Sequence, residues 1–142
     1  MSPLACHLEH LELAGSSGRD IHDVTPRVAQ AVTNRGVRPW LATAHTPGAT
    51  AALNTIEKES GVLEHPRLAL ERLVPREGRH VHDARRGDGN GCGQARAALL
   101  GTSPSVPVLE VRPLLGAWRQ TVVMDLDNRP RVRRVVIQAL GE

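Results

Sequence analysis

The sequence predicts an α+β fold, and two observations support this class. Val- and Leu-rich segments separated by turns fill the last third of the chain, as expected for a meander of strands. Earlier in the chain, helical and strand patterns are mixed and are punctuated by Pro, Gly and Asn. Strands that gather after a mixed start favour α+β over regularly alternating α/β units.

The length of 142 residues predicts one domain that spans residues 1–142 and can bury a substantial core. Hydrophobic residues make up 40% of the chain, yet Phe and Tyr do not occur. The core must therefore be built from Leu, Val, Ile and Ala.

The first half of the chain predicts three strands and one helix. Residues 4–13 read as an edge strand and residues 14–19 as a turn. Thr25 as N-cap, Pro26 at the first helical position and Gly36 after the end predict a helix between them. Its buried stripe should be Val28, Ala31 and Val32. Residues 37–44 read as a strand, and residues 46–57 as a loop that leads into another short strand.

The second half predicts two helices followed by strands. A helix over residues 66–74 should turn Leu68, Leu70 and Leu73 inward. Residues 75–93 read as a long polar loop, which in a compact domain is usually functional or disordered. A helix over 94–100 follows. Residues 107–111, 114–127 and 131–140 read as strands, with a turn at residues 127–130.

Charge and cysteine content narrow the class of protein. Lys58 is the only lysine among 18 basic residues, and the net charge of +3 is modest. Arginine binds phosphate in a bidentate manner, so an anionic small molecule is compatible with this composition. We expect no nucleic-acid partner, since long basic runs and interleaved aromatic residues do not occur. The chain also has neither an apolar run of membrane-spanning length nor an N-terminal signal pattern, and only two cysteines, so we expect a cytoplasmic protein.

The most distinctive stretch is Gly87–Gly101, in which four glycines alternate with other residues before a helical run. Such glycines allow left-handed backbone and close approach to a ligand. The first N–H groups of the following helix would face the loop, a natural setting for an anion. The stretch matches neither a Walker loop nor a dinucleotide motif, so a structural turn and a ligand-binding loop both remain open.

Several side chains have the chemistry of a site. His80 and His82 would share one face of a strand, and Asp83 or Cys92 could complete a metal site with them, although an ordinary pair of loop histidines has the same spacing. Glu57 is either a positioned base or a solvated carboxylate. Four arginines around the last turn either hold a phosphate or form a charged edge; these are Arg129, Arg131, Arg133 and Arg134.

Taken in order, these motifs resemble the YjbQ-like family, often called secondary thiamine-phosphate synthases. The resemblance runs from about Asp20 to Glu142 and rests on TAALNTIE, LERLVPREG, HDARRGDGNG, ARAALLGTS, VPVLEVRPLLGAWRQ and DLDNRPRVRRVVIQALGE. It implies a single-domain α+β fold with a twisted, barrel-like mixed sheet and two to three helices. It also implies a homotrimer with sites near subunit boundaries.

The family resemblance further implies a weak condensation of a hydroxymethylpyrimidine diphosphate with a thiazole phosphate. On this comparison His82, Glu57 and Asn90 would be catalytic. Gly87, Asp88, Gly89, Gly91 and Arg129 would bind substrate, with Trp118 packed beneath it or at a subunit boundary. His82 and Cys92 would hold a divalent metal, zinc or magnesium. Either metal ion can stabilise the charge on a departing diphosphate.

The sequence departs from the family pattern at the centre of this site. Cys92, Gly93 and Gln94 stand where relatives commonly carry His-Ser-His, and His80 stands where they carry Tyr. His45 is either the equivalent of a histidine found in the family, or an unrelated residue in a chain that resembles a branch without a histidine at this position. Both interpretations remain open. Two hypotheses therefore remain: a trimeric enzyme, or a catalytically inactive trimer that keeps the pocket for binding a ligand.

Overall fold

The computed structural model describes residues 2–15, 20–33 and 37–142 and confirms the α+β class. Four helices and eight strands occur in these residues, where the sequence predicted two to three helices. In chain order they are β1 (Ala5–Ala14), β2 (Ile21–Asp23), α1 (Thr25–Val32), β3 (Pro39–His45), β4 (Ala51–Ile56), α2 (Ser60–Leu73), α3 (Val81–Arg86), α4 (Gly91–Leu100), β5 (Ser105–Leu109), β6 (Arg112–Pro113), β7 (Gln120–Asp125) and β8 (Val132–Gly141).

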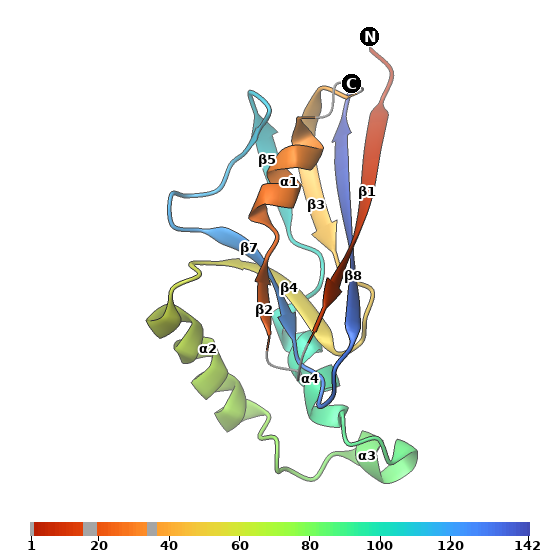
Figure 1. Ribbon diagram of the computed structural model, residues 1–142, viewed down its shortest axis with the longest axis vertical. Coiled ribbons are helices and arrows are strands. Elements are labelled where there is room, and N and C mark those ends of the chain that lie inside the picture. The colour runs from red at the N-terminus through yellow and green to blue at the C-terminus, as the bar shows by residue number, and fades with distance from the viewer. Residues whose placement is uncertain (1, 16–19, 34–36) are drawn as a thin grey trace.

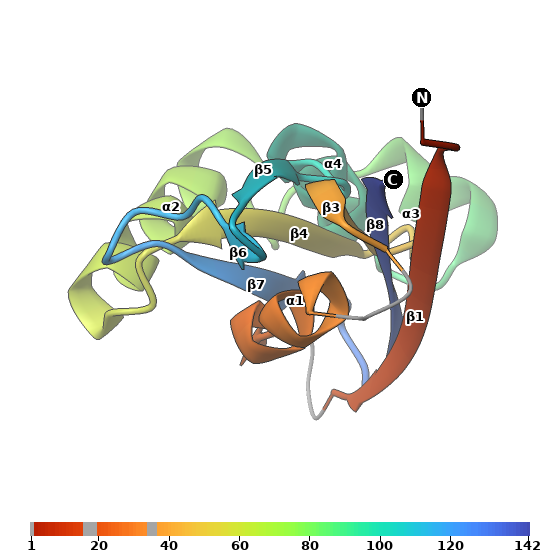
Figure 2. The ribbon, with the colours of Figure 1, turned by 90° about the horizontal axis from the view of Figure 1, so that it is seen from above.

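The strands form two sheets that curl around α1 into an open half-barrel (Figures 1 and 2). The larger sheet has the order β1-β8-β3-β5-β6, and the smaller one has the order β2-β7-β4. The barrel-like shape agrees with the prediction. All strand pairs in the described residues are antiparallel, whereas the sequence suggested a mixed sheet. The first strand lies at an edge, as expected, and pairs with β8 from Ala5–Gly141 to Ala14–Val132.

The core lies between α1 and the inner faces of both sheets. Val28, Ala31 and Val32 are the buried residues of α1, so the predicted stripe is confirmed. They join aliphatic side chains from both sheets, including Leu53 and Ile137. Each fully buried Val, Leu or Ile contributes about 1.5–3 kcal/mol of transfer free energy, so this aliphatic core needs no aromatic residue.

The start of α1 is shifted by one residue from the prediction. Val24 is the N-cap, and Thr25 is the first helical residue. The Asp23 carboxylate accepts a hydrogen bond from the Thr25 N–H at 2.9 Å, and the Thr25 hydroxyl accepts one from the Thr121 N–H at 2.8 Å. Pro26 follows in the first turn, where its missing N–H costs nothing. Gly36 and residues 16–19 of the predicted turn lie outside the described residues.

Helix α2 is longer than predicted and presents a different face. The Glu59 carboxylate caps its start, accepting hydrogen bonds from the N–H groups of Gly61 and Val62 at 3.0 Å each. Leu70 is buried, but Leu68 and Leu73 are 47% and 72% exposed, so the prediction that they point inward is wrong. The inward face instead follows helical spacing from earlier in the helix, with Leu63, Pro66, Arg67 and Leu70 lining a small cavity.

The predicted long loop over residues 75–93 is also wrong, because it contains a helix. Helix α3 occupies Val81–Arg86, and α4 already begins at Gly91. Gly87 ends α3 in the left-handed conformation, with a φ of 71°, and its N–H donates to the Asp83 carbonyl at 2.8 Å. The glycine therefore marks a helix C-terminus as well as a loop.

Helix length and hydropathy decide whether a helix could span a membrane. Within the described ranges, none of the helices combines the length and apolar character that crossing a bilayer requires.

Candidate functional site

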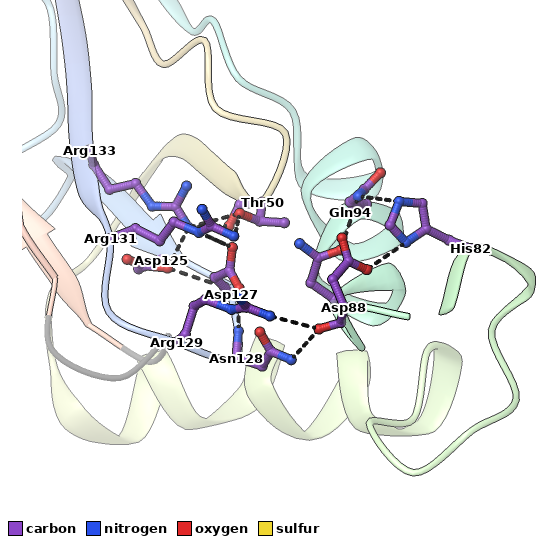
Figure 3. A network of polar contacts seen from close by, with 11 residues as sticks. Thr50, His82, Asp88, Gln94, Asp125, Asp127, Asn128, Arg129, Arg131 and Arg133 are labelled. Carbon is purple, nitrogen blue, oxygen red and sulfur yellow. Dashed lines mark hydrogen bonds and ion pairs between the residues drawn. The ribbon is translucent and has the colours of Figure 1, made fainter. Parts of the chain in front are cut away.

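Three chain segments meet at one end of the half-barrel. They are α3, the loop from Gly87 to Asn90 that leads into α4, and the turn between β7 and β8 (Figure 3). These segments contain most of the residues that the sequence placed in the site.

Glycines permit the close approach of α3 to α4. Gly89 has a left-handed φ of 69°, which an L side chain rarely adopts. At Gly91, an added Cβ would lie 2.9 Å from the Asp83 carboxylate and 3.0 Å from the His80 Cβ. The Gly91 N–H donates instead to that carboxylate at 2.8 Å. This contact places His82 and Asp83 beside the glycine-rich loop.

One imidazole and two carboxylates converge there. His82 Nδ1 lies 3.3 Å from Asp88 Oδ1 and 3.7 Å from Asp83 Oδ1. One ligand atom from each residue lies within 4.8 Å of the other two. His82 Nδ1 and Asp88 Oδ1 are both buried, and neither makes a hydrogen bond of good geometry within the described chain. A cation bound between these two atoms would give each of them a partner.

Gln94 contacts the other nitrogen of the His82 ring. Its side-chain amide lies 2.9 Å from His82 Nε2 and 3.1 Å from Asn90 Oδ1 (Figure 3). An imidazole that binds a cation through Nδ1 carries its proton on Nε2 and needs an acceptor there. As placed, Gln94 Nε2 donates to Asn90 Oδ1 and faces His82 Nε2, so Gln94 offers its oxygen to the ring only if the Asn90 amide turns over together with it.

Cys92 and His80 lie outside this cluster. The Cys92 S–H donates to the Val74 carbonyl at 3.5 Å, and burial raises the pKa of the thiol. The neutral thiol is a poor metal ligand and faces away from His82, with which the sequence paired it. His80 precedes α3 and contacts the Pro75 carbonyl through Nε2 at 3.0 Å. His80 and His82 would share one face only on a strand, and here His82 lies in α3 with His80 as its N-cap.

The β7–β8 turn holds the loop from its other side. Asn128 Nδ2 and Arg129 Nη2 donate to the Asp88 carbonyl at 3.0 and 3.1 Å (Figure 3). Arg129, which the sequence assigned to a phosphate, thus contacts the loop backbone. The sequence singled out neither Asn128 nor the buried carboxylates Asp125 and Asp127. The residues DNRP are typical of any turn, so they do not reveal whether the turn supports a site.

A pocket of about 110 Å³ lies between this turn and the start of α4. Asn90 is only 7% exposed and lines it together with the first residues of the helix. The full lining is Arg76, Gly89, Asn90, Cys92, Gly93, Arg96, Leu126, Asp127 and Asn128. The Asn90 side chain makes no capping hydrogen bond, although Asn commonly caps a helix.

Glu57, Trp118 and His45 lie elsewhere on the protomer. Glu57 and Trp118 line a separate open pocket of about 400 Å³, together with Arg119. Trp118 is 74% exposed, so it does not pack beneath the His82 cluster of its own chain. His45 is the last residue of β3, and its Nδ1 lies 2.6 Å from the Ser103 hydroxyl. Within one chain, the structure thus gathers His82, Asp83, Asp88, Asn90 and Gln94, but leaves Glu57 apart.

Comparison with known proteins identifies the family. The family model for UPF0047 protein YjbQ-like matches residues 9–142. A UPF0047 protein from Archaeoglobus fulgidus is 37% identical over 121 residues, which cover 85% of this chain and 91% of that protein. A UPF0047 protein from Methanothermobacter thermautotrophicus is 30% identical over 136 residues, covering 96% and 93%.

Solved structures share the fold. A YbjQ-like protein of unknown function from Sulfolobus solfataricus P2 superposes with a TM-score of 0.89 at 21% identity, covering 99% of this chain and all of that one. An uncharacterised conserved protein of the YjbQ/UPF0047 family from Clostridium acetobutylicum gives 0.82 at 25% identity, covering 92% and 98%. The chain belongs to the YjbQ-like UPF0047 family.

Proposed function

We propose that this protein binds a divalent cation at His82, Asp83 and Asp88 and a small phosphorylated compound beside it. The observation that carries the proposal is the convergence of one imidazole and two carboxylates within 4.8 Å on the glycine-rich loop. The pocket at the start of α4 lies against the same loop and is lined by Arg76 and by Arg96, whose guanidinium is held by Glu71 and the Val74 carbonyl. Helix N–H groups and arginine are common phosphate ligands.

The donor set fits zinc or magnesium for different reasons. Zinc accepts imidazole nitrogen together with carboxylate oxygen. Magnesium prefers oxygen ligands, and it usually keeps several waters and takes one or two carboxylates beside substrate phosphates. Gln94 would serve either metal as the acceptor behind the His82 ring, and not as a direct ligand.

The reaction that the family resemblance implies gives this arrangement a chemical use. Condensing hydroxymethylpyrimidine diphosphate with thiazole phosphate releases pyrophosphate, and a bound cation would stabilise the charge on that leaving group. Asn90 and the backbone of the Gly87–Gly91 loop would orient the substrate. Glu57 and Trp118 would contribute from their separate pocket if an assembled homotrimer brings that pocket to the site of a neighbouring chain.

A second candidate function is binding without catalysis. The Cys92 thiol is neutral and turned toward Val74, and Gln94 is uncharged, so two positions that are histidine in relatives offer no strong ligand here. A trimer that keeps the pocket and binds a ligand would need neither of them.

One experiment separates the two candidates. The protein is purified without added metal, its zinc and magnesium contents are measured, and thiamine phosphate formation is assayed with each metal. Metal-dependent activity that His82→Ala abolishes supports the enzyme. An inactive parent that gains activity in the Cys92→His/Gln94→His double variant supports the binding protein. A parent that binds no divalent cation at millimolar concentration contradicts the cation site itself.

A further inference from the structure

We infer that Asn128 and Arg129 are positioning residues for the cation site, acting through the backbone of Asp88. This inference rests on the proposed cation site and adds to it a pair of residues that touch no ligand. Both side chains come from the β7–β8 turn, 40 and 41 residues along the chain from the carbonyl that they hold.

The two donors converge on one oxygen. Asn128 Nδ2 lies 3.0 Å and Arg129 Nη2 lies 3.1 Å from the Asp88 carbonyl. A carbonyl oxygen has two acceptor sites, so the pair can satisfy it fully. With the carbonyl held on one side of the loop, the Asp88 carboxylate is directed to the other side, where it meets His82 Nδ1 at 3.3 Å.

The backbone of the Gly87–Asn90 loop can place the Asp88 carbonyl next to Asn128 only because residue 89 is a glycine. Gly89 adopts a φ of 69°, and a Cβ there would lie 3.1 Å from Asn128 Nδ2. The glycine thus permits both the left-handed turn and the close passage of the Asn128 amide. A flexible glycine-rich loop needs such an external contact, because its own backbone restricts it weakly.

The turn that carries the donors is itself fixed by a buried network. Asp127 is 1% exposed and accepts hydrogen bonds from Thr50 at 2.7 Å and from Arg131 at 2.8 Å. Burial alone would raise the pKa of Asp127, but these bonds and one from the Asn128 N–H outweigh it and hold the pKa below the usual range. Arg133, also buried, bridges Thr50 and Asp125, at 2.9 and 2.7 Å. Asn128 therefore projects from a rigid support.

Charge and position predict opposite effects for Arg129. Removing a positive charge near a cation site should strengthen cation binding, since like charges repel. Removing a residue that positions Asp88 should weaken it. Arg134 provides a charge-matched control, because it is an exposed arginine of β8, close to the same turn in the chain, and its partner is Glu12 at 3.6 Å.

The test measures Mn²⁺ binding by calorimetry for the wild type and for Asn128→Ala, Arg129→Ala, the double variant, Asn128→Gln and Arg134→Ala. We expect each single alanine variant to bind about 5-fold more weakly, and the double variant at least about 10-fold more weakly. Asn128→Gln, which keeps the donor, should recover part of the loss. Arg134→Ala should bind at least as tightly as the wild type.

Amide exchange without metal provides a readout that does not depend on the cation site. The N–H groups of residues 87–91 should exchange faster in the double variant. Wild-type affinity in both alanine variants would overturn the inference, as would unchanged exchange. A wild type that binds no Mn²⁺ would overturn the proposed function, and exchange would then show separately whether Asn128 and Arg129 order the loop.

Discussion

The two nitrogens of His82 have different neighbours, and this difference defines the candidate site. Nδ1 faces Asp83 and Asp88, whereas Nε2 faces the Gln94 amide. A neutral imidazole has one donor and one acceptor nitrogen, so the contact at Nε2 sets what Nδ1 can do. Gln94 stands where relatives carry a histidine that could bind a metal. In this structure it instead contacts His82 and can orient that imidazole.

Substitution of Gln94 tests this assignment. Gln94→Leu removes the acceptor behind His82 and should weaken Mn²⁺ binding about 10-fold. Gln94→Glu retains an acceptor oxygen and should bind at least as tightly as the wild type. Calorimetry at pH 7.5 measures both variants. Equal affinity of the leucine variant and the wild type would rule out a role for Gln94 in orienting the ring.

At the same scale, Gly91 should tolerate no side chain. Gly91→Ala would place a Cβ 3.2 Å or closer to one atom each of His80, His82 and Asp83, and would force α3 and its N-cap away from α4. We expect a loss of about 1–3 kcal/mol in the free energy of unfolding, measured with urea. Gly116→Ala is the matched control, because a Cβ there meets no described atom within 4 Å. Similar stability of the two variants would contradict the close approach.

The sequence pointed to several residues that the structure brings together in the candidate site, but it did not show which side chains contact one another. His82, Asp88, Asn90 and the glycines were visible because their residue types and spacing carry chemistry. Burial raises the pKa of the Cys92 thiol, which is turned toward the Val74 carbonyl, and no local pattern records this contact. Asn128 and the Thr50–Asp127 contact join residues far apart in the chain, so only the folded structure brings them into view.

Among the elements, α2 depends on charged contacts more than on a buried stripe. Leu70 is its buried residue, and Arg96 of α4 reaches back to Glu71 at 2.6 Å and to the Val74 carbonyl. Arg96 is 2% exposed, so a guanidinium held in the interior fixes the end of this helix. The spacing of Leu68, Leu70 and Leu73 predicted a buried leucine stripe, and this prediction assigned the wrong face of α2 to the interior.

The Arg96–Glu71 pair gives α2 a pH dependence. Hydrogen bonds from the Arg76 N–H and from Arg96 lower the pKa of Glu71. A carboxylate whose pKa is lowered on folding contributes stability above its unfolded pKa and loses it as the pH falls through the folded value. Glu71→Gln should therefore be less stable than the wild type at pH 7, and the difference should shrink as the pH falls below about 4.3, the unfolded pKa, until Glu71 is protonated in the folded state as well. Thermal unfolding between pH 3 and pH 7 measures it, and a difference that stays the same from pH 7 to pH 3 would contradict this account.

At the scale of the whole molecule, the fold was more predictable than the site. The α+β class and the curled sheet follow from strand-rich segments and from a family resemblance that covers nearly the entire chain. Helix α3 was missed because Gly87 was interpreted as a loop residue, although it caps a helix. Boundaries of short helices depend on such capping contacts, which the sequence shows only indirectly.

We predict that the protein assembles as a homotrimer. Several large apolar side chains are exposed on the protomer, among them Trp40, Leu109 and Trp118 at 51%, 60% and 74%. Exposed apolar surface of this kind commonly marks an interface. Sedimentation equilibrium at micromolar concentration should give three times the 15.4 kDa mass of the chain. A mass equal to one chain would contradict the prediction and would leave the Glu57 pocket without a route to the cation site.

The central claim is that His82, Asp83 and Asp88 bind a divalent cation. Crystals soaked in MnCl₂ test it most directly through anomalous scattering recorded near the manganese edge. The account predicts an anomalous peak in contact with His82 Nδ1 and the two carboxylates, and its loss in Asp88→Asn crystals. A well-ordered site without such a peak at saturating Mn²⁺, or a peak held only by other residues, would contradict it.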